Sequence, residues 1–227
     1  MLTMSTPEGR MGRMVAAASR PVKKGPDRYH HGDLRRALLH EALRTIRKRG
    51  VDALTLRGVA EDLGVSRTAL YRHFTDKNAL LEAVAREGFR MLRVATGDGW
   101  ERGGKGTSGF EAMGVAYVRF AVENPEHYRV MFGGALSSPV RDPELAKEGG
   151  AAFQVLVDAL IDQQRDGLIR RDAPLQLAQF IWAIVHGIAM LAIDRLPRSG
   201  HTDVDALAHY AIARVRTGIA ARTVARA

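Results

Sequence analysis

Cysteine is absent from this chain of 227 residues, which excludes disulfide bonds, thiolate metal sites and a cysteine nucleophile. The absence also fits a reducing compartment, so we expect a cytoplasmic protein. Long hydrophobic runs are missing as well, because no run of 18 consecutive apolar residues occurs, and this argues against a membrane span. The longest apolar run, Phe180 to Ile193, contains His186 and is interpreted as a buried helix. We expect no membrane partner.

The common signatures of catalytic and metal sites are also missing. No serine lies in a G-x-S-x-G motif, and no histidines have the spacing H-x-x-x-H or H-E-x-x-H. Gly99 to Gly106 matches part of a phosphate-binding loop, but Gly106 stands where a hydroxyl residue would hold magnesium. We therefore expect no catalytic residues, no metal site and no cofactor.

Positive charge is concentrated at one end of the chain, whose formal net charge is +9. Residues 1–50 carry 12 Lys and Arg against 4 Asp and Glu. Residues 51–100 carry 7 against 7, and residues 101–227 carry 15 against 14. A basic end next to a neutral remainder is typical of a protein that binds a polyanion at one end only.

Residues 51–81 have the pattern of a helix-turn-helix. Ala60 is small where two helices would cross, and Gly64 is placed at a sharp turn, where glycine accepts a positive φ. Ser66 is placed to cap the second helix, and Leu70 is its inward residue. Its outward side chains form a set of donors suited to the major groove of duplex DNA: Arg67, Thr68, Tyr71, Arg72 and His73.

This segment resembles the DNA-binding domain of TetR-type bacterial transcriptional regulators. The phrases LTLRGVAEDLGVSRTALYRHF and DKNALLEAV carry the resemblance, together with YHHGDLRRALLHEALRTIRKRG upstream, and the match extends from Tyr29 to about Leu92. The alternative is an αα-hairpin of a helical bundle with a solvated basic face.

The resemblance implies double-stranded DNA as a partner, with phosphate contacts from Tyr71, His73 and Lys77. Arg67 and Thr68 are the candidates for base contacts, because they lie at the N-terminal end of the second helix. Further DNA contacts are expected around this helix and from the residues before the first helix: Ser66, Arg72, Thr55, Arg57, Arg28, Tyr29 and His30.

The chain is expected to be all-α, with an N-terminal three-helix helix-turn-helix domain and a C-terminal helical domain for ligand binding and dimerisation. Residues 1–27 lack an apolar period and are expected to form a disordered basic arm. The DNA-binding domain is assigned to residues 28–96, with helices at 33–50, 56–63, 67–74 and 76–95. The glycine-rich segment 97–109 is interpreted as a flexible loop, and the C-terminal domain takes 97–227.

Helices in the C-terminal domain are expected from about residue 110, then over 125–132, 142–167, 174–197 and 203–222. Trp182, His186 and Gly187 form the pattern W-x-x-x-H-G, which resembles the C-terminal domain of one TetR subgroup. These residues either pack the core and a dimer contact or line a ligand cavity, where a ligand would supply the partner that a buried imidazole needs. The candidate cavity walls are Phe110, Met113, Tyr117, Tyr128, Phe153, Trp182 and His186.

We therefore expect a homodimeric DNA-binding repressor that a small, largely apolar ligand releases from a pseudo-palindromic operator. Two alternatives remain open at this point. The regulator could be gated by a protein partner and have no ligand cavity, or the C-terminal domain could be an enzyme with a pocket at His186.

Overall fold

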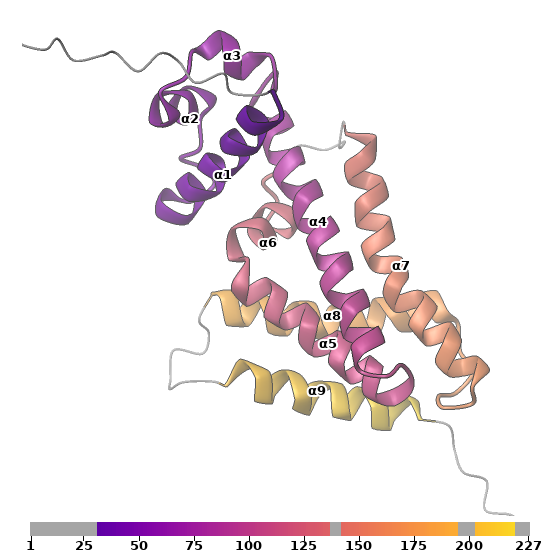
Figure 1. The fold of residues 1–227 in the computed structure, drawn as a ribbon. Helices are drawn as coiled ribbons and strands as arrows, with labels where there is room; N and C mark the ends of the chain where they lie inside the picture. The colour runs from indigo at the N-terminus through magenta and orange to yellow at the C-terminus, as the bar shows by residue number, and fades with distance from the viewer. Residues whose placement is uncertain (1–30, 137–141, 195–202, 221–227) are drawn as a thin grey trace, which may run out of the picture.

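The chain is described by a computed structural model over residues 31–136, 142–194 and 203–220. These described residues form nine α-helices and no strand, as the all-α prediction requires (Figure 1). The helices are α1 (His31–Arg49), α2 (Leu56–Leu63), α3 (Arg67–Tyr71), α4 (Lys77–Arg102), α5 (Gly106–Glu123), α6 (Pro125–Phe132), α7 (Pro143–Arg165), α8 (Pro174–Ile193) and α9 (Val204–Ile219).

The first three helices form a small lobe at one end of α4 (Figure 1). The inward face of α1 is apolar, since Leu38 and Ala42 are fully buried and Ile46 is 5% exposed. Helix α1 begins at His31, two residues before the predicted start at Asp33. Leu70 and Phe74 close the core of this lobe from the side of α3.

Helix α4 contradicts the predicted loop at the glycine-rich segment. It was expected to end near Ala95, but it continues to Arg102, and only three residues separate it from α5. The glycines serve close helix packing instead. A Cβ added to Gly99 would lie 2.9 Å from the carbonyl oxygen of Ala112, and one added to Gly103 would lie 2.7 Å from Cα of Gly109. The absence of side chains thus lets α4 and α5 lie against each other.

The larger lobe is built around α4 and α5. Helices α6 and α7 also pack on α4, whereas α8 and α9 pack on α5 (Figure 1). The predicted helix starts at Pro125, Pro143 and Pro174 are confirmed, with each proline in the first turn, where its missing N–H costs nothing. Helix α9 ends at Ile219, before the predicted end at Arg222. Arg222 and Pro197 lie outside the described residues.

Helix α8 is long and apolar enough to cross a membrane by length and composition alone. In this fold it is a packing helix, and its contacts are with α5, α7 and α9. Ala178, Ile181 and Ala189 are buried on one side, but Phe180 is 55% exposed and Leu191 is 47% exposed on the other. The interpretation of Phe180 to Ile193 as a buried helix therefore holds for one side of α8 only.

Candidate functional site

The turn between α2 and α3 is set by two small residues. Gly64 adopts φ 66°, in the left-handed region that glycine enters without steric cost. The backbone N–H of Val65 donates to the carbonyl oxygen of Ala60 at 3.0 Å, and Ala60 is 1% exposed. The two helices therefore meet in the tight turn that the sequence predicts.

Two hydroxyl side chains cap these helices. The Thr55 hydroxyl oxygen accepts from the backbone N–H of Gly58 at 3.0 Å, and that of Ser66 accepts from the N–H of Ala69 at 3.1 Å. The Ser66 cap is the one the sequence predicts. A capping hydroxyl uses a lone pair and keeps its own hydrogen, so each can still donate to an outside acceptor. Capping and the proposed DNA contacts are therefore compatible.

The outward face of α3 is polar and open. Leu70 is 1% exposed and fixes the helix to the lobe, whereas the next residue, Tyr71, is 53% exposed. Arg67, Thr68 and Arg72 are exposed on the same helix and its C-cap. His73 is half-buried and lies just beyond α3, because the helix ends at Tyr71 rather than at the predicted Phe74.

Two predicted cationic contacts already have partners within the protein. The Lys77 ammonium donates to the carbonyl oxygens of Val51 and Asp52, at 3.0 and 3.3 Å, so it ties the start of α4 to the loop before α2. The exposed Arg57 guanidinium pairs with Glu61 at 2.7 Å along α2. Both residues lie near α3 in the sequence, but the charged group of each already has a partner within the protein. Arg28, Tyr29 and His30 lie outside the described residues.

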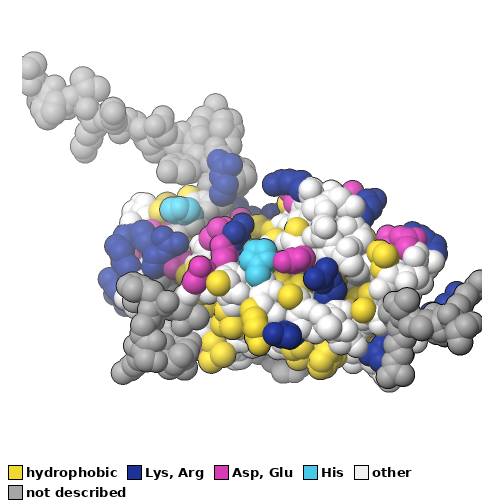
Figure 2. All heavy atoms as spheres, turned by 90° about the horizontal axis from the view of Figure 1, so that it is seen from below, with side chains coloured by type: hydrophobic (Ala, Val, Ile, Leu, Met, Phe, Trp, Pro, Cys, Tyr) yellow, Lys and Arg dark blue, Asp and Glu magenta, His cyan; other side chains and the backbone are white. Residues whose placement is uncertain are grey.

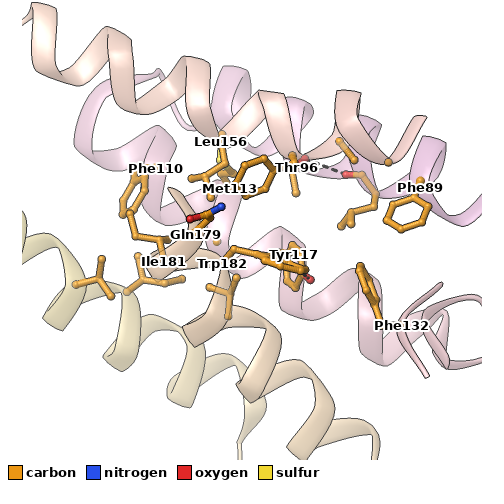
Figure 3. Close-up of a pocket in the computed structure, with 18 residues that line it drawn as sticks. Phe89, Thr96, Phe110, Met113, Tyr117, Phe132, Leu156, Gln179, Ile181 and Trp182 are labelled. Carbon is orange, nitrogen blue, oxygen red and sulfur yellow. Dashed lines mark hydrogen bonds between the residues drawn. The ribbon is translucent and has the colours of Figure 1, made fainter. Parts of the chain in front are cut away.

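A cavity of about 340 Å³ lies in the larger lobe, with walls from α4 to α9 (Figure 3). Five predicted wall residues line it: Phe110, Met113, Tyr117, Phe153 and Trp182. The remaining wall is also largely apolar, and none of the described residues that line the cavity carries a charge. Its size falls at the lower end of the range for small-molecule sites.

The other two predicted wall residues, Tyr128 and His186, lie behind the wall and do not line the cavity. The Trp182 indole N–H donates to the Tyr117 hydroxyl at 2.9 Å. That hydroxyl lies 2.9 Å from the Tyr128 hydroxyl, which in turn lies 2.7 Å from Nδ1 of His186. Tyr128 therefore supplies a partner for Nδ1 of His186 within the protein, and this nitrogen needs no ligand.

Burial shifts the pKa values of the three titratable side chains in this cluster, His186, Tyr117 and Tyr128. Burial lowers the pKa of His186, which favours the neutral imidazole. Burial also raises the pKa of Tyr117 to about 12, despite opposing hydrogen bonds from Tyr128 and Trp182, and it raises the pKa of Tyr128. At neutral pH the whole cluster is therefore uncharged.

Several wall residues escaped the sequence analysis. Phe89 comes from α4 and lies within the range 28–96 that the sequence assigns to the DNA-binding domain, and Phe132 lies at the end of α6. Leu156 lines the cavity from α7. Gln179 carries no sequence signal, because Gln176 is a similar polar residue on the same apolar helix and the sequence does not indicate which of the two faces the cavity.

Helix α6 connects this wall to the first lobe. Its Glu126 is 5% exposed and accepts two hydrogen bonds from the Arg47 guanidinium of α1, at 2.6 and 3.2 Å. Burial by itself would raise the pKa of Glu126, but the Arg47 contact outweighs it and the pKa is lowered. Gly88 of α4 lies under α6, where an added Cβ would be 3.2 Å from Cβ of His127. Arg47, Glu126 and Phe132 thus link α1 to the cavity.

The outer face of α8 and α9 is apolar and uncovered. Figure 2, which views the molecule from below, shows hydrophobic side chains gathered along one side of this surface. Large exposed apolar side chains on these helices are Leu175, Phe180, Leu191 and Tyr210. An added Cβ on Gly187 would meet no described atom within 4 Å, so no helix of the described chain packs closely against this residue.

Family models match both lobes. Residues 38–84 match the model described as "Bacterial regulatory proteins, tetR family", and residues 110–215 match "Tetracyclin repressor-like, C-terminal domain". Together the two matches span well over half of the chain. The chain belongs to the TetR family and is a DNA-binding transcriptional regulator.

Three relatives are informative. The HTH-type transcriptional repressor AcnR of Corynebacterium diphtheriae is 29% identical over 177 residues, or 74% of this chain and 84% of that protein. The HTH-type transcriptional repressor Rv1474c of Mycobacterium tuberculosis is 41% identical over 71 residues, which are 31% of this chain and 38% of that protein. The solved structure of a protein with unknown function from Rhodococcus sp. RHA1 has TM-score 0.76 and 34% identity, and the match covers 85% of this chain and 98% of that one.

Proposed function

We propose that this regulator is a homodimeric, cytoplasmic repressor that a small, largely apolar ligand releases from a pseudo-palindromic operator. The observation that carries the proposal is the uncharged cavity of about 340 Å³ in the larger lobe. Two curated relatives named as repressors support the sign of regulation. We also propose that the chain falls in the subgroup with the W-x-x-x-H-G pattern.

In this proposal the DNA contacts are those predicted from the sequence. Arg67 and Thr68 contact base edges, and Tyr71, His73 and Lys77 contact phosphates, with Arg72 on the same surface. The exposure of Arg67, Thr68 and Tyr71 supports this assignment. Thr55, Arg57, Ser66 and Lys77 flank the same surface, and Arg28, Tyr29 and His30 would extend it from the N-terminal side.

Dimerisation would use the outer faces of α8 and α9. Four large apolar side chains are exposed there, and a second copy of the chain would bury them. One α3 reads only a few base pairs, so two copies would be needed for a specific site. Light scattering that finds a monomer at micromolar concentration, with specific DNA binding intact, would contradict this part of the proposal.

The cavity supports the ligand-gated proposal over gating by a protein partner, because that alternative requires no internal space. The enzyme alternative has little support. Tyr117 and Tyr128 are the described residues hydrogen-bonded to His186, and both are uncharged at neutral pH. We therefore propose no catalytic role for the cluster.

The test begins by selecting DNA sites for the purified chain from a randomised pool. The expected result is a site with two inverted halves. A panel of uncharged apolar compounds is then screened for release of that site, with a scrambled site as the control. Compounds that bind without changing DNA affinity would contradict ligand gating, because a ligand shifts an equilibrium only through a difference in affinity between two states.

A further inference from the structure

The cavity wall has few polar side chains, and the structure shows what each of them does. Thr96 donates its hydroxyl hydrogen to the carbonyl oxygen of Leu92 at 2.9 Å, within α4. Trp182 donates its indole N–H to the hydroxyl of Tyr117. Neither hydrogen is therefore free for a molecule in the cavity.

The Tyr117 hydroxyl is also hydrogen-bonded inside the protein, to the Trp182 indole and to the Tyr128 hydroxyl. An indole N–H only donates, so the Tyr117 oxygen accepts at that end of the chain of hydrogen bonds. A neutral His186 with its proton on Nε2 accepts at Nδ1 from Tyr128, which leaves the Tyr128 oxygen to accept from Tyr117. The opposite direction would leave the Tyr117 hydrogen facing an apolar wall without an acceptor, an arrangement that costs free energy.

Gln179 differs from the other polar wall residues. Its side chain is exposed, and it forms no hydrogen bond with any other described residue. Figure 3 draws its carboxamide among the wall residues that surround the cavity. A carboxamide both donates and accepts, so Gln179 offers the hydrogen-bonding group that the buried wall lacks.

We infer that the ligand of this regulator is an uncharged amphiphile whose apolar body fills the cavity and whose single hydrogen-bonding group, a hydroxyl, carbonyl or amide, lies at Gln179. The inference rests on the proposed function, since it names the class of ligand for the same cavity. A carboxylate or an ammonium would find no opposite charge among the described wall residues, and one neutral carboxamide does not compensate for the cost of desolvating a full charge.

The test compares three probes of nearly equal shape with the full-length protein at neutral pH: 4-butylbenzyl alcohol, 4-butylbenzoate and 4-butylbenzylammonium. Binding is measured by isothermal titration calorimetry. We expect the alcohol to bind at least about tenfold more tightly than either ion, because the wall compensates neither charge. Equal or tighter binding of the benzoate or the ammonium would overturn the inference and would leave the cavity as a ligand site. Failure of all three probes to bind would count against the proposed function as well.

The position of the polar group is tested with Gln179→Leu. This variant should lower the affinity for the alcohol by roughly 3- to 10-fold, the range for one lost hydrogen bond, and should leave binding of plain butylbenzene unchanged. The matched control is Gln154→Leu on α7, an exposed glutamine that bonds Asp158 and does not line the cavity. Unchanged alcohol affinity in Gln179→Leu, or an equal loss in Gln154→Leu, would overturn the placement at Gln179.

Discussion

The two lobes use their polar side chains in opposite ways. On α3 the polar groups point outward, and Tyr71 at 53% exposure follows directly on Leu70 at 1%. In the larger lobe the polar groups Tyr117, Tyr128 and His186 bond one another behind an apolar cavity. Substitutions on the first surface should therefore change binding with little change in stability, whereas those around the cavity should change both.

The largest expected effect separates two adjacent residues of the first lobe. Leu70→Ala should lower the free energy of unfolding by about 2–5 kcal/mol, because it leaves a cavity in a small core. Tyr71→Ala should change it by less than about 0.5 kcal/mol, because the side chain is exposed. Urea unfolding followed by circular dichroism measures both. Similar losses in the two variants would show that Tyr71 is part of the core.

A smaller effect is expected on DNA binding. Arg67→Ala should make the free energy of binding to a selected DNA site less favourable by about 1–3 kcal/mol and relax the sequence preference of the protein.

Lys77→Ala is the contrasting variant. It should weaken specific and random DNA equally and reduce the salt slope by about one ion if the ammonium contacts a phosphate. Since Lys77 binds two loop carbonyls, its stability is measured alongside. An equal loss on both kinds of DNA for Arg67→Ala would remove this residue from the base contacts.

The ion pair between Arg47 of α1 and Glu126 of α6 should affect the coupling between ligand binding and DNA binding more than it affects either affinity alone. Arg47→Ala removes the partner of Glu126 and the ion pair between α1 and α6. We expect DNA affinity and ligand affinity to stay near wild type, while the effect of ligand on DNA affinity falls by about 0.5–2 kcal/mol. Fluorescence anisotropy of labelled DNA with and without ligand measures this difference. Arg44→Ala, which removes another ion pair of α1, is the control. Unchanged coupling in Arg47→Ala would show that α6 acts on the first lobe by another contact.

The smallest expected effect is a dependence of stability on pH. Burial lowers the pKa of His186 in the fold below its unfolded value of about 6.5. As the pH falls through that value, the unfolded chain binds the proton first, so the free energy of unfolding decreases, by at most about 1.4 kcal/mol per pH unit. The loss ends below the folded pKa, where both states are protonated. His186→Asn should show a shallower decrease in the same window, measured by urea unfolding at several pH values. Parallel curves would assign the decrease to other groups.

The first lobe was predictable because its determinants are local. Gly64, Ser66 and Leu70 fix a turn, a cap and an inward face within a few residues, and each has the predicted role. The cavity was predictable only in part. The hydrogen bond between Tyr128 and His186 joins positions 58 residues apart. Helical periodicity indicates which residues face inward, but it does not indicate which polar side chains from different helices will bond each other.

The glycine-rich segment shows a different limit. Glycine marks loops, but it also occurs where two helices approach closely, and the sequence does not distinguish the two cases at Gly99 and Gly103. The structure assigns both residues to the contact between α4 and α5. The same interpretation predicts that α4 ends near Ala95, whereas the helix continues to Arg102.

The continuity of α4 has a geometric consequence. With 26 residues at 1.5 Å each, the helix is about 39 Å long, and it is a stiff rod with one end beside α3 and the other beside α5. A tilt of about 5° around one end would displace the other by about 3 Å, close to the rise of one base pair along DNA. No loop interrupts the rod to absorb such a tilt. A tilt of this size would therefore be enough to carry the α3 surface out of register with the bases.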